Sequence, residues 1–255
     1  MTIKKAPTKT PTKRIVLLVL VAIVWTVASI IASQLLIGYL LILILGSEAL
    51  SQPLWTAIYS ALSYILALIL IIIVPPLVFK KHPELKSDRI SLGLRGLPTW
   101  SDIGLAPVGF IVYLMLASVI TWFFTLFPWF NPEQAQNVGF STYMTSVDRI
   151  IAFFTLVIIA PIAEEVIFRG WLYGRLRARF SKKVSDTTSM ILSMLLVSLV
   201  FGLVHFQWNV GVNVFAMSIV LCGLREITGT IYSGIILHIL KNGLAFYLIY
   251  VIGIA

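Results

Sequence analysis

The sequence predicts an all-α fold, a polytopic transmembrane bundle of about seven or eight helices, and two observations carry this prediction. The first is composition: of 255 residues, 59% are hydrophobic and only 11% are charged, whereas an ordinary soluble domain carries about 25% charged residues. The second is that the apolar residues form long runs, which give a mean hydropathy of +1.00. So few charges cannot cover a water-exposed surface, and lipid must therefore be the solvent for much of the chain.

Seven apolar segments are candidates for helices that cross the bilayer, which takes about 20 residues. They cover residues 15–45, 54–79, 103–127, 150–163 with its continuation, 187–205, 210–224 and 230–254. None shows the strict alternation of a membrane β-strand, which leaves helices as the spanning structure. Segment 15–45 is too long for the apolar region of a cleaved signal peptide, so we expect it to be a first membrane helix.

The positions of the basic residues predict the orientation of the bundle. They cluster before the first span, between the second and third, and after the fourth, whereas the loops 46–53 and 128–147 contain no Lys or Arg. The three clusters are Lys4, Lys5, Lys9, Lys13 and Arg14; Lys80, Lys81, Lys86, Arg89 and Arg95; and Arg175, Arg177, Arg179, Lys182 and Lys183. This alternation predicts a cytoplasmic N-terminus in a cell-membrane protein. The same positions explain the net charge of +9 as basic residues that flank membrane spans. We therefore expect no nucleic-acid partner.

Two adjacent glutamates interrupt the fourth apolar run. Ionisable groups are costly inside membrane helices and are functional candidates for that reason. Glu165 and Arg169 are four residues apart and can form an ion pair on one helix face, while Glu164 points about 100° away. We expect Arg169 to neutralise and position Glu165, which leaves Glu164 free to act as a general base. The alternative is that both glutamates only pair with Arg169 and His205 to hold helices together.

Two further pairs of residues place polar groups in later spans. Phe201 and His205 are four apart and share a helix face, as do His238 and Asn242. A lone membrane histidine usually makes an interhelical hydrogen bond. Two histidines and an asparagine together with a glutamate pair supply more: a base, a second water-binding group and two neutral donors. Those groups are what the hydrolysis of an amide requires.

The three motifs, EExxxR at 164–169, FxxxH at 201–205 and HxxxN at 238–242, resemble those of the CPBP family, which contains type II CAAX prenyl proteases and bacteriocin-processing enzymes and is also called Abi. The resemblance covers roughly 148–242, with 228–231 among its flanking residues. The three N-terminal spans match in hydropathy only, apart from a weaker likeness over residues 100–105. The resemblance divides the chain into a basic cytoplasmic tail (1–14), N-terminal transmembrane helices (15–147) and a catalytic core (148–255).

The resemblance implies an intramembrane endopeptidase, with about eight helices around a polar catalytic cavity open to the cytoplasm or to lipid. It implies that Glu164 and His205 activate a water molecule. It also implies that His238 and Asn242 form an oxyanion hole. The substrate would be a membrane-associated protein or peptide, either a CAAX-type tail or a leader peptide.

The same resemblance gives Glu165 and Arg169 a supporting role and makes Phe201 a packing partner of His205. No cofactor is expected. A zinc-dependent protease with Glu164, His205 and His238 as ligands is the nearest alternative, because a catalytic zinc site has three N or O ligands and a water. The chain nevertheless lacks the HExxH motif of many zinc proteases.

Two alternatives come from other functional classes. One is a non-catalytic membrane scaffold or immunity protein with the same fold. The other is a transporter, for which repeated halves would be expected and for which the sequence shows no internal repeat.

One conflict concerns depth in the membrane. If the fifth span begins at 187 near the cytoplasmic surface, His205 lies about 27 Å further along the helix. That position is near the far surface, away from a Glu164 at the cytoplasmic boundary. The conflict disappears if the fifth helix begins in the cytoplasm, if it is steeply tilted, or if Glu164 lies deeper.

Overall fold

The computed structural model describes residues 11–78, 87–134 and 145–253. Across these ranges every regular element is a helix, and seven helices are long and apolar enough to cross a membrane. They are Thr12–Leu45, Pro53–Leu77, Trp100–Thr125, Ser146–Phe180, Asp186–Leu203, Trp208–Thr228 and Tyr232–Ile252. The predicted all-α, multi-pass membrane fold is confirmed, with seven long helices in the described part of the chain.

Some of these helices are built from several elements. The N-terminal half contains α1 (Thr12–Leu45), the 3-10 turn η1 (Ser47–Ser51), α2 (Pro53–Leu68), the π-helical η2 (Ile69–Ile73), α3 (Val74–Val78) and α4 (Trp100–Thr125). The C-terminal half contains α5 (Ser146–Phe153), η4 (Phe154–Ile159), α6 (Ala160–Glu164), η5 (Glu165–Tyr173), α7 (Gly174–Phe180), α8 (Asp186–Leu203), α9 (Trp208–Thr228), α10 (Tyr232–Phe246) and η6 (Tyr247–Ile252). Of the basic residues that predict orientation, six lie outside the described ranges: Lys4, Lys5, Lys9, Lys80, Lys81 and Lys86.

The helix ends follow local sequence signals. A capping box begins α4, where Thr99 and Asp102 each bond the other's backbone N–H. A second capping box, made by Thr145 and Asp148, begins α5. At the end of the bundle where α4 begins, α9 stops at Gly229, whose φ of 70° lies in the left-handed region that favours glycine. The spans therefore begin and end where the polar residues can satisfy the free backbone groups.

One long helix runs through the centre of the molecule. Elements α5 to α7 form a continuous helix of 35 residues, Ser146–Phe180, so the apolar segment 150–163 continues through the glutamate motif. At the α-helical rise it is about 52 Å long, against roughly 30 Å for a hydrocarbon core, so one end projects from the bilayer. Two π-helical stretches, η4 and η5, lie within it, and such stretches are frequent at functional sites.

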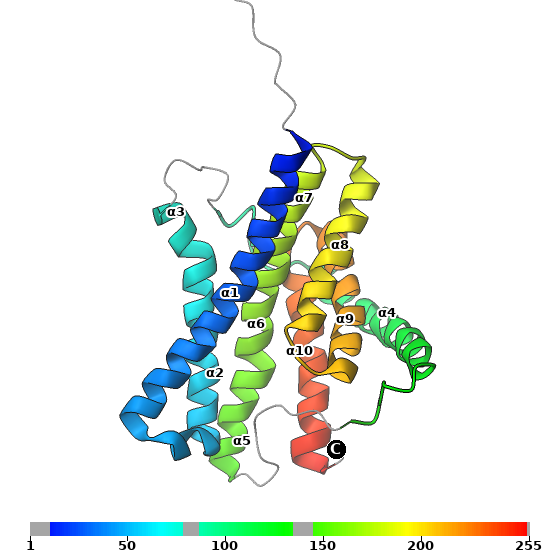
Figure 1. Ribbon diagram of the computed structural model, residues 1–255. Helices are drawn as coiled ribbons and strands as arrows, with labels where there is room; N and C mark the ends of the chain where they lie inside the picture. The colour runs from blue at the N-terminus through cyan, green and yellow to red at the C-terminus, as the bar shows by residue number, and fades with distance from the viewer. Residues whose placement is uncertain (1–10, 79–86, 135–144, 254–255) are drawn as a thin grey trace, which may run out of the picture.

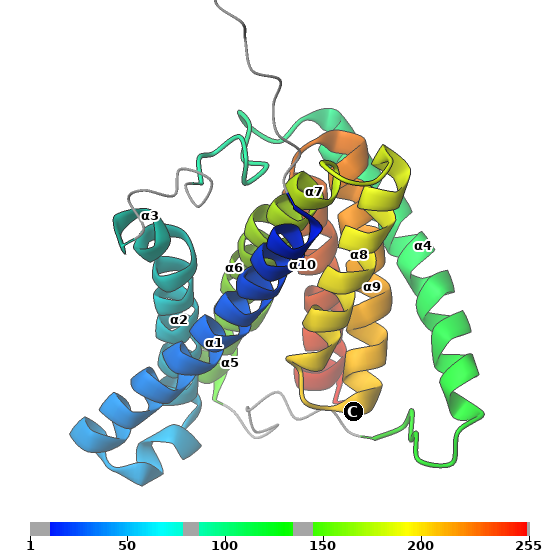
Figure 2. The same ribbon diagram turned by 45° about the horizontal axis from the view of Figure 1, so that its top comes forward.

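The other helices pack around this rod. In Figure 1 the start of α1, the end of α3 and α7 lie at the top, while α5 and the C-terminal end lie at the bottom. Helix α1 crosses α2 and contacts α7. Figure 2 shows α4 at one edge of the bundle and the pair α1–α2 at the other, with the long helix and α8 to α10 between them. Every described member of the three basic clusters lies at the end of the molecule where α7 ends, as the predicted orientation requires.

Contacts at the top of α8 resolve the conflict over depth. Arg177 in α7 pairs with Asp186, the first residue of α8, with Nη2 and Oδ1 2.8 Å apart. Ser189 Oγ also donates to the Arg177 carbonyl at 3.1 Å. Helix α8 therefore begins beside the projecting end of the long helix, thirteen residues beyond Glu164. From there α8 runs back along the long helix, and His205, just after its end, lines the same cavity as Glu164.

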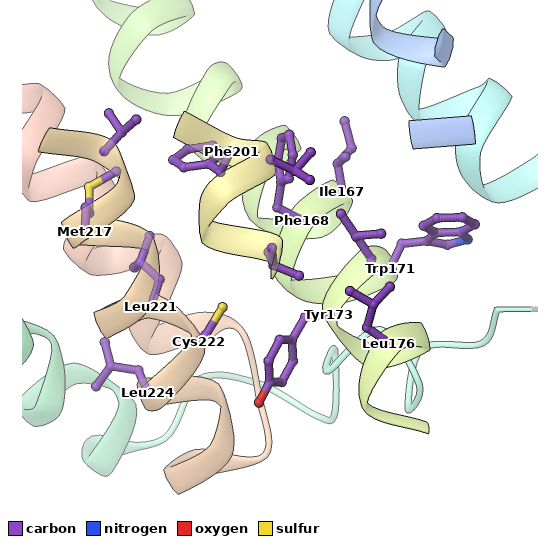
Figure 3. Close-up of a cluster of buried hydrophobic side chains, with 14 of the residues drawn as sticks. Ile167, Phe168, Trp171, Tyr173, Leu176, Phe201, Met217, Leu221, Cys222 and Leu224 are labelled. Carbon is purple, nitrogen blue, oxygen red and sulfur yellow. The ribbon is translucent and has the colours of Figure 1, made fainter. Parts of the chain in front are cut away.

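The apolar core lies between the long helix, α8 and α9. Figure 3 shows Ile167, Phe168 and Trp171 of the long helix together with Phe201 of α8 and Met217 of α9. All five side chains are buried, with at most 3% of their surface exposed. This packing holds the EExxxR and FxxxH segments against each other, so the core itself positions the polar residues described next.

Candidate active site

Glu164, at the end of α6, stands between two helices. On one side the Tyr64 hydroxyl of α2 donates a hydrogen bond to Glu164 Oε1. On the other side Oε2 lies 3.7 Å from His238 Nε2 of α10, and the side chain is 15% exposed. A separation of 3.7 Å is too long for a direct hydrogen bond but suits a bridging water molecule. Tyr64 and His238 thus orient Glu164, and its carboxylate is not held in a close ion pair.

Glu165 faces the interior and joins two other residues. Its Oε1 accepts a hydrogen bond from Arg169 Nη1 at 2.9 Å, and both side chains are fully buried. The expected Glu165–Arg169 ion pair is therefore present. The same oxygen lies 3.1 Å from His238 Nδ1. A carboxylate only accepts, so His238 Nδ1 carries a proton and Nε2 is the nitrogen that faces Glu164.

A glycine makes room for this arrangement. A Cβ built on Gly234 would lie 2.9 Å from Glu165 Oε2, which is closer than van der Waals contact allows. Gly234 is four residues before His238 on α10, so both lie on the helix face that the long helix contacts. The missing side chain is what allows the Glu165 carboxylate to lie against α10 and reach the histidine.

His205 follows the end of α8, in the turn that leads to α9. Its Nδ1 lies 2.7 Å from the carbonyl oxygen of Phe201. A carbonyl only accepts, so Nδ1 carries the proton and Nε2 keeps its lone pair. The next residue, Phe206, has a left-handed backbone with a φ of 54°, which reverses the chain toward α9. The turn therefore presents His205 with its basic nitrogen available.

The ring of Phe201 packs against both halves of the site. It is fully buried and lies 4.8 Å from the Phe168 ring and 5.0 Å from the His205 ring, measured between centroids. The Arg169 guanidinium sits 4.3 Å from its centroid, and the His238 ring is 6.2 Å away. A cation over an aromatic face is attracted to it. Phe201 thus packs beside His205 as expected, and it also contacts the charged residues.

Asn242 lies one turn beyond His238 on α10. Its Nδ2 donates to the carbonyl oxygen of Leu156, in the π-helical η4, at 2.9 Å. This bond uses one of the two amide protons and ties α10 to the long helix. The structure thus places Asn242 beside the site, on the His238 side, without a hydrogen bond to either glutamate.

A cavity opens beside Glu164 and His205. Its volume is 170 Å³, which is room for several water molecules. The first two spans give it polar walls: Ser33, Gln34, Ser60, Ser63 and Tyr64. A carboxylate and a histidine therefore share a small polar chamber inside an apolar bundle.

The proposed zinc ligands do not gather into a metal site. Throughout residues 11–78, 87–134 and 145–253, no group of three or more His, Cys, Asp or Glu side chains is placed to hold a metal ion. Glu164 Oε2 and His238 Nε2 lie 3.7 Å apart, and His205 has its Nδ1 bonded to the Phe201 carbonyl.

Lys241 adds a cation near the cavity. It is half-buried, lies one turn from His238, and interacts electrostatically with Glu164 and His205. No carboxylate of the described chain comes within ion-pair distance of it. Lys241 therefore makes the surroundings of Glu164 more positive without contacting it.

Two residues that contribute to this arrangement were not predicted from the sequence. Tyr64 shares a helix face with Ser60 and Ser63, and this polar stripe in an apolar span was the available signal. The other is Asp102 of α4, which is 1% exposed. Its Oδ1 accepts hydrogen bonds from Thr230 at 2.7 Å and Ser233 at 3.0 Å. Asp102 therefore joins segments 100–105 and 228–231, both of which share in the family resemblance of the sequence.

One comparison with known proteins matches the segment that contains these residues. Residues 146–244 match the family model described as type II CAAX prenyl endopeptidase Rce1-like. No curated protein and no solved structure matches the chain. The matched segment runs from the start of the long helix to just beyond Asn242, so it contains all three motifs. The match supports a protease, a hydrolase of the CAAX type. Over residues 146–244 the chain is similar to the Rce1-like type II CAAX prenyl endopeptidases.

Proposed function

We propose that the protein is a metal-free intramembrane endopeptidase in which Glu164 and His205 activate the attacking water. The observation that carries the proposal is the placement of Glu164. Its carboxylate is held by Tyr64 and faces His238, and with His205 it lines a polar cavity that has room for water. The family match supports a hydrolase.

The chemistry follows from the protonation of each group. A water between Glu164 and His205 gives a proton to the Glu164 carboxylate while its oxygen bonds to the scissile carbonyl carbon. Glu164 then delivers that proton to the amide nitrogen as the C–N bond breaks. His205 Nε2, with its lone pair free, accepts a hydrogen bond from the same water and orients it. The products are a carboxylic acid and an amine.

The negative charge that develops on the carbonyl oxygen needs donors. His238 is oriented for this by Glu165, which fixes the Nδ1 proton and directs Nε2 toward Glu164. Because Nδ1 already carries a proton, His238 donates to the oxyanion in its doubly protonated form, with a second proton on Nε2. Asn242 supplies a second donor through the amide proton that Leu156 does not use. Arg169 balances the charge of Glu165, and Phe201 packs both in place.

The substrate in this proposal is a membrane-associated protein or peptide, with a CAAX-type tail or a leader peptide at the cleaved bond. The protein would lie in the cell membrane with its N-terminus in the cytoplasm, because the basic clusters share one end of the bundle. A zinc enzyme with Glu164, His205 and His238 as ligands is the second candidate mechanism. A non-catalytic scaffold or immunity protein of the same fold is the second candidate function.

One experiment separates these three. Peptide termini are compared by mass spectrometry in membranes of the host cells carrying the wild type, Glu164→Gln or Gly223→Ala, at matched expression. Gly223 lies on α9, and a Cβ there meets no atom within 4 Å, so its variant controls for expression and folding. Each sample is split, and one half is treated with a strong zinc chelator.

The proposal expects termini that are produced by the wild type and Gly223→Ala, disappear with Glu164→Gln, and persist under chelation. Loss under chelation would establish the zinc mechanism. Equal termini in all three membranes would favour the scaffold and contradict an endopeptidase.

A further inference from the structure

A second cavity, unrelated to Glu164, lies at the end of the bundle where α7 ends. It has a volume of 640 Å³ and is lined by η5, α7, segment 87–95 and the end of α9. Seven of its lining residues are charged. Six are cations and one is an acid among the described residues: Arg95, Arg175, Arg177, Arg179, Lys182 and Arg225, with Glu226. We refer to it as the basic cavity.

The single carboxylate of the basic cavity is already engaged. Glu226 Oε1 accepts a hydrogen bond from Tyr173 at 2.7 Å and from Arg177 Nε at 3.1 Å. Arg177 Nη2 bonds Asp186 Oδ1 at 2.8 Å and Glu226 Oε2 at 3.4 Å. Glu226 therefore neutralises Arg177 and has little capacity left for the other cations around it.

Arg225 is held by two backbone carbonyls, and its guanidinium also lies 5.7 Å from the centre of the Tyr173 ring. Its Nη1 donates to the carbonyl of Gly170 at 3.0 Å and its Nη2 to the carbonyl of Ser91 at 2.8 Å. Carbonyl oxygens carry no net charge, and Arg225 has no carboxylate within ion-pair distance in the described part of the chain. A guanidinium held this way is a preorganised positive charge, because its orientation has been set before any ligand arrives.

The helix surface is shaped to admit Arg225. A Cβ built on Gly174 would lie 3.1 Å from Arg225 Nη2 and 3.2 Å from the Ser91 carbonyl oxygen. A neighbouring cation, Arg175, is oriented as well, with Nη2 donating to Ser87 Oγ at 3.0 Å and its guanidinium 4.7 Å from the centre of the Trp171 ring. These contacts distinguish the basic cavity from a set of solvated lysines and arginines.

The apolar residues near its rim place it at a bilayer surface. Ile90 lines the cavity and is 59% exposed. Leu97 and Trp100 follow in the same segment, and 83% and 87% of their surfaces are exposed. Tryptophan prefers the membrane–water interface. Basic pockets between membrane helices at that level suit the phosphate of a lipid headgroup, because arginine bonds phosphate oxygens two at a time.

We propose that the basic cavity binds a phosphate group, above all that of an anionic phospholipid from the surrounding leaflet. The proposal is independent of the proposed function, because it involves neither Glu164 nor a substrate. Inorganic phosphate has the same chemistry, so the test distinguishes the two sources.

The test measures lipid binding with two double variants of equal charge. Arg179→Gln/Lys182→Gln removes two cations from the cavity wall. Arg14→Gln/Lys183→Gln removes two from the same end of the bundle that do not line the cavity. Lys182 and Lys183 are both exposed and adjacent in the sequence, so they form a matched pair. The full-length protein is reconstituted in nanodiscs of phosphatidylcholine with increasing phosphatidylglycerol, and bound lipid is counted by native mass spectrometry after release.

Each cation near an anionic headgroup contributes about 1 kcal/mol, or roughly fivefold in affinity. The wild type is expected to retain phosphatidylglycerol in preference to phosphatidylcholine. The cavity variant should lose that preference by roughly 25-fold, and the control variant by less than about threefold. Equal losses in the two variants would show general surface attraction and overturn the proposal. So would a wild type without preference for phosphatidylglycerol.

A third sample adds inorganic phosphate to wild type in pure phosphatidylcholine. A rise in melting temperature that the cavity variant lacks would identify free phosphate as a ligand of the same cavity. No rise, with phosphatidylglycerol retained, would identify the lipid as the source. In phosphatidylcholine alone, all three proteins should melt at the same temperature, which shows that the substitutions leave the fold intact.

Discussion

Gly202 in α8 and Gly211 in α9 meet backbone to backbone. A Cβ added to Gly202 would lie 2.8 Å from the Gly211 carbonyl oxygen, and one added to Gly211 would lie 2.9 Å from that of Gly202. His205 lies in the turn between these two glycines. The approach of α8 to α9 therefore determines where the histidine sits.

Gly202→Ala is expected to separate the two helices and displace His205. The clash is with backbone, which cannot rotate away, so we expect a loss of about 1 to 3 kcal/mol of stability and a large loss of activity. Thermal unfolding in detergent and the peptide-terminus assay measure the two effects. Gly223→Ala, where the added methyl meets no neighbouring atom, should be neutral or slightly stabilising. An unchanged Gly202→Ala protein would contradict the close packing.

Tyr64→Phe removes the hydroxyl that bonds Glu164 and keeps the ring. A hydrogen bond to a charged group contributes roughly 1.5 to 3 kcal/mol, so kcat should fall about 10- to 100-fold with little change in KM. Tyr59→Phe is the matched control, because Tyr59 lies on the same helix and lines the same cavity without being a hydrogen-bond partner of Glu164. Equal losses in both variants would mean that Tyr64 acts only through packing.

The buried Glu165–Arg169 pair should behave as a unit. Glu165→Gln or Arg169→Met leaves one charge buried without its partner, which costs about 3 to 5 kcal/mol. The double variant should recover much of that stability. It should not recover activity, because His238 would lack the carboxylate that fixes its Nδ1 proton. Chemical or thermal unfolding of the four proteins tests this, and strictly additive losses would exclude the coupling.

Asp102→Asn should affect stability and leave the chemistry intact. The substitution weakens the hydrogen bonds from Thr230 and Ser233 that join α4 to α10, and we expect a loss of about 1 to 3 kcal/mol. Activity per folded molecule should remain near that of the wild type. Asp148→Asn removes the other capping-box carboxylate, which has only local partners, and should cost less. A greater loss of specific activity than of stability would place Asp102 in the reaction.

Local spacing predicted the parts of the site that lie on one helix. The ion pair between Glu165 and Arg169 follows from their separation of four residues, and the spans follow from hydropathy. Tyr64 could not be paired with Glu164 in this way, because 100 residues separate them and only the packing of α2 against the long helix brings them together. The hydrogen bond of Asn242 is accepted by the backbone carbonyl of Leu156. Every residue type has such a carbonyl, so the sequence could not predict this partner.

Composition also could not predict how deep the fifth helix lies in the membrane. The apolar segment predicted the start of α8 to within one residue, at Asp186, but not the level of that start relative to the long helix. The contacts of Asp186 and Ser189 with Arg177 set that level.

The continuity of the helix Ser146–Phe180 has a consequence for the proposed reaction. Thirteen residues separate Glu164 from Arg177, and because nine of them form the π-helical η5, the α-helical rise gives an upper limit of about 20 Å for that interval. In the proposed mechanism the scissile bond therefore has to sit at a set distance below the level of the arginines. Substrates can therefore be selected first by the depth of their scissile bond in the leaflet, before any of their side chains is recognised.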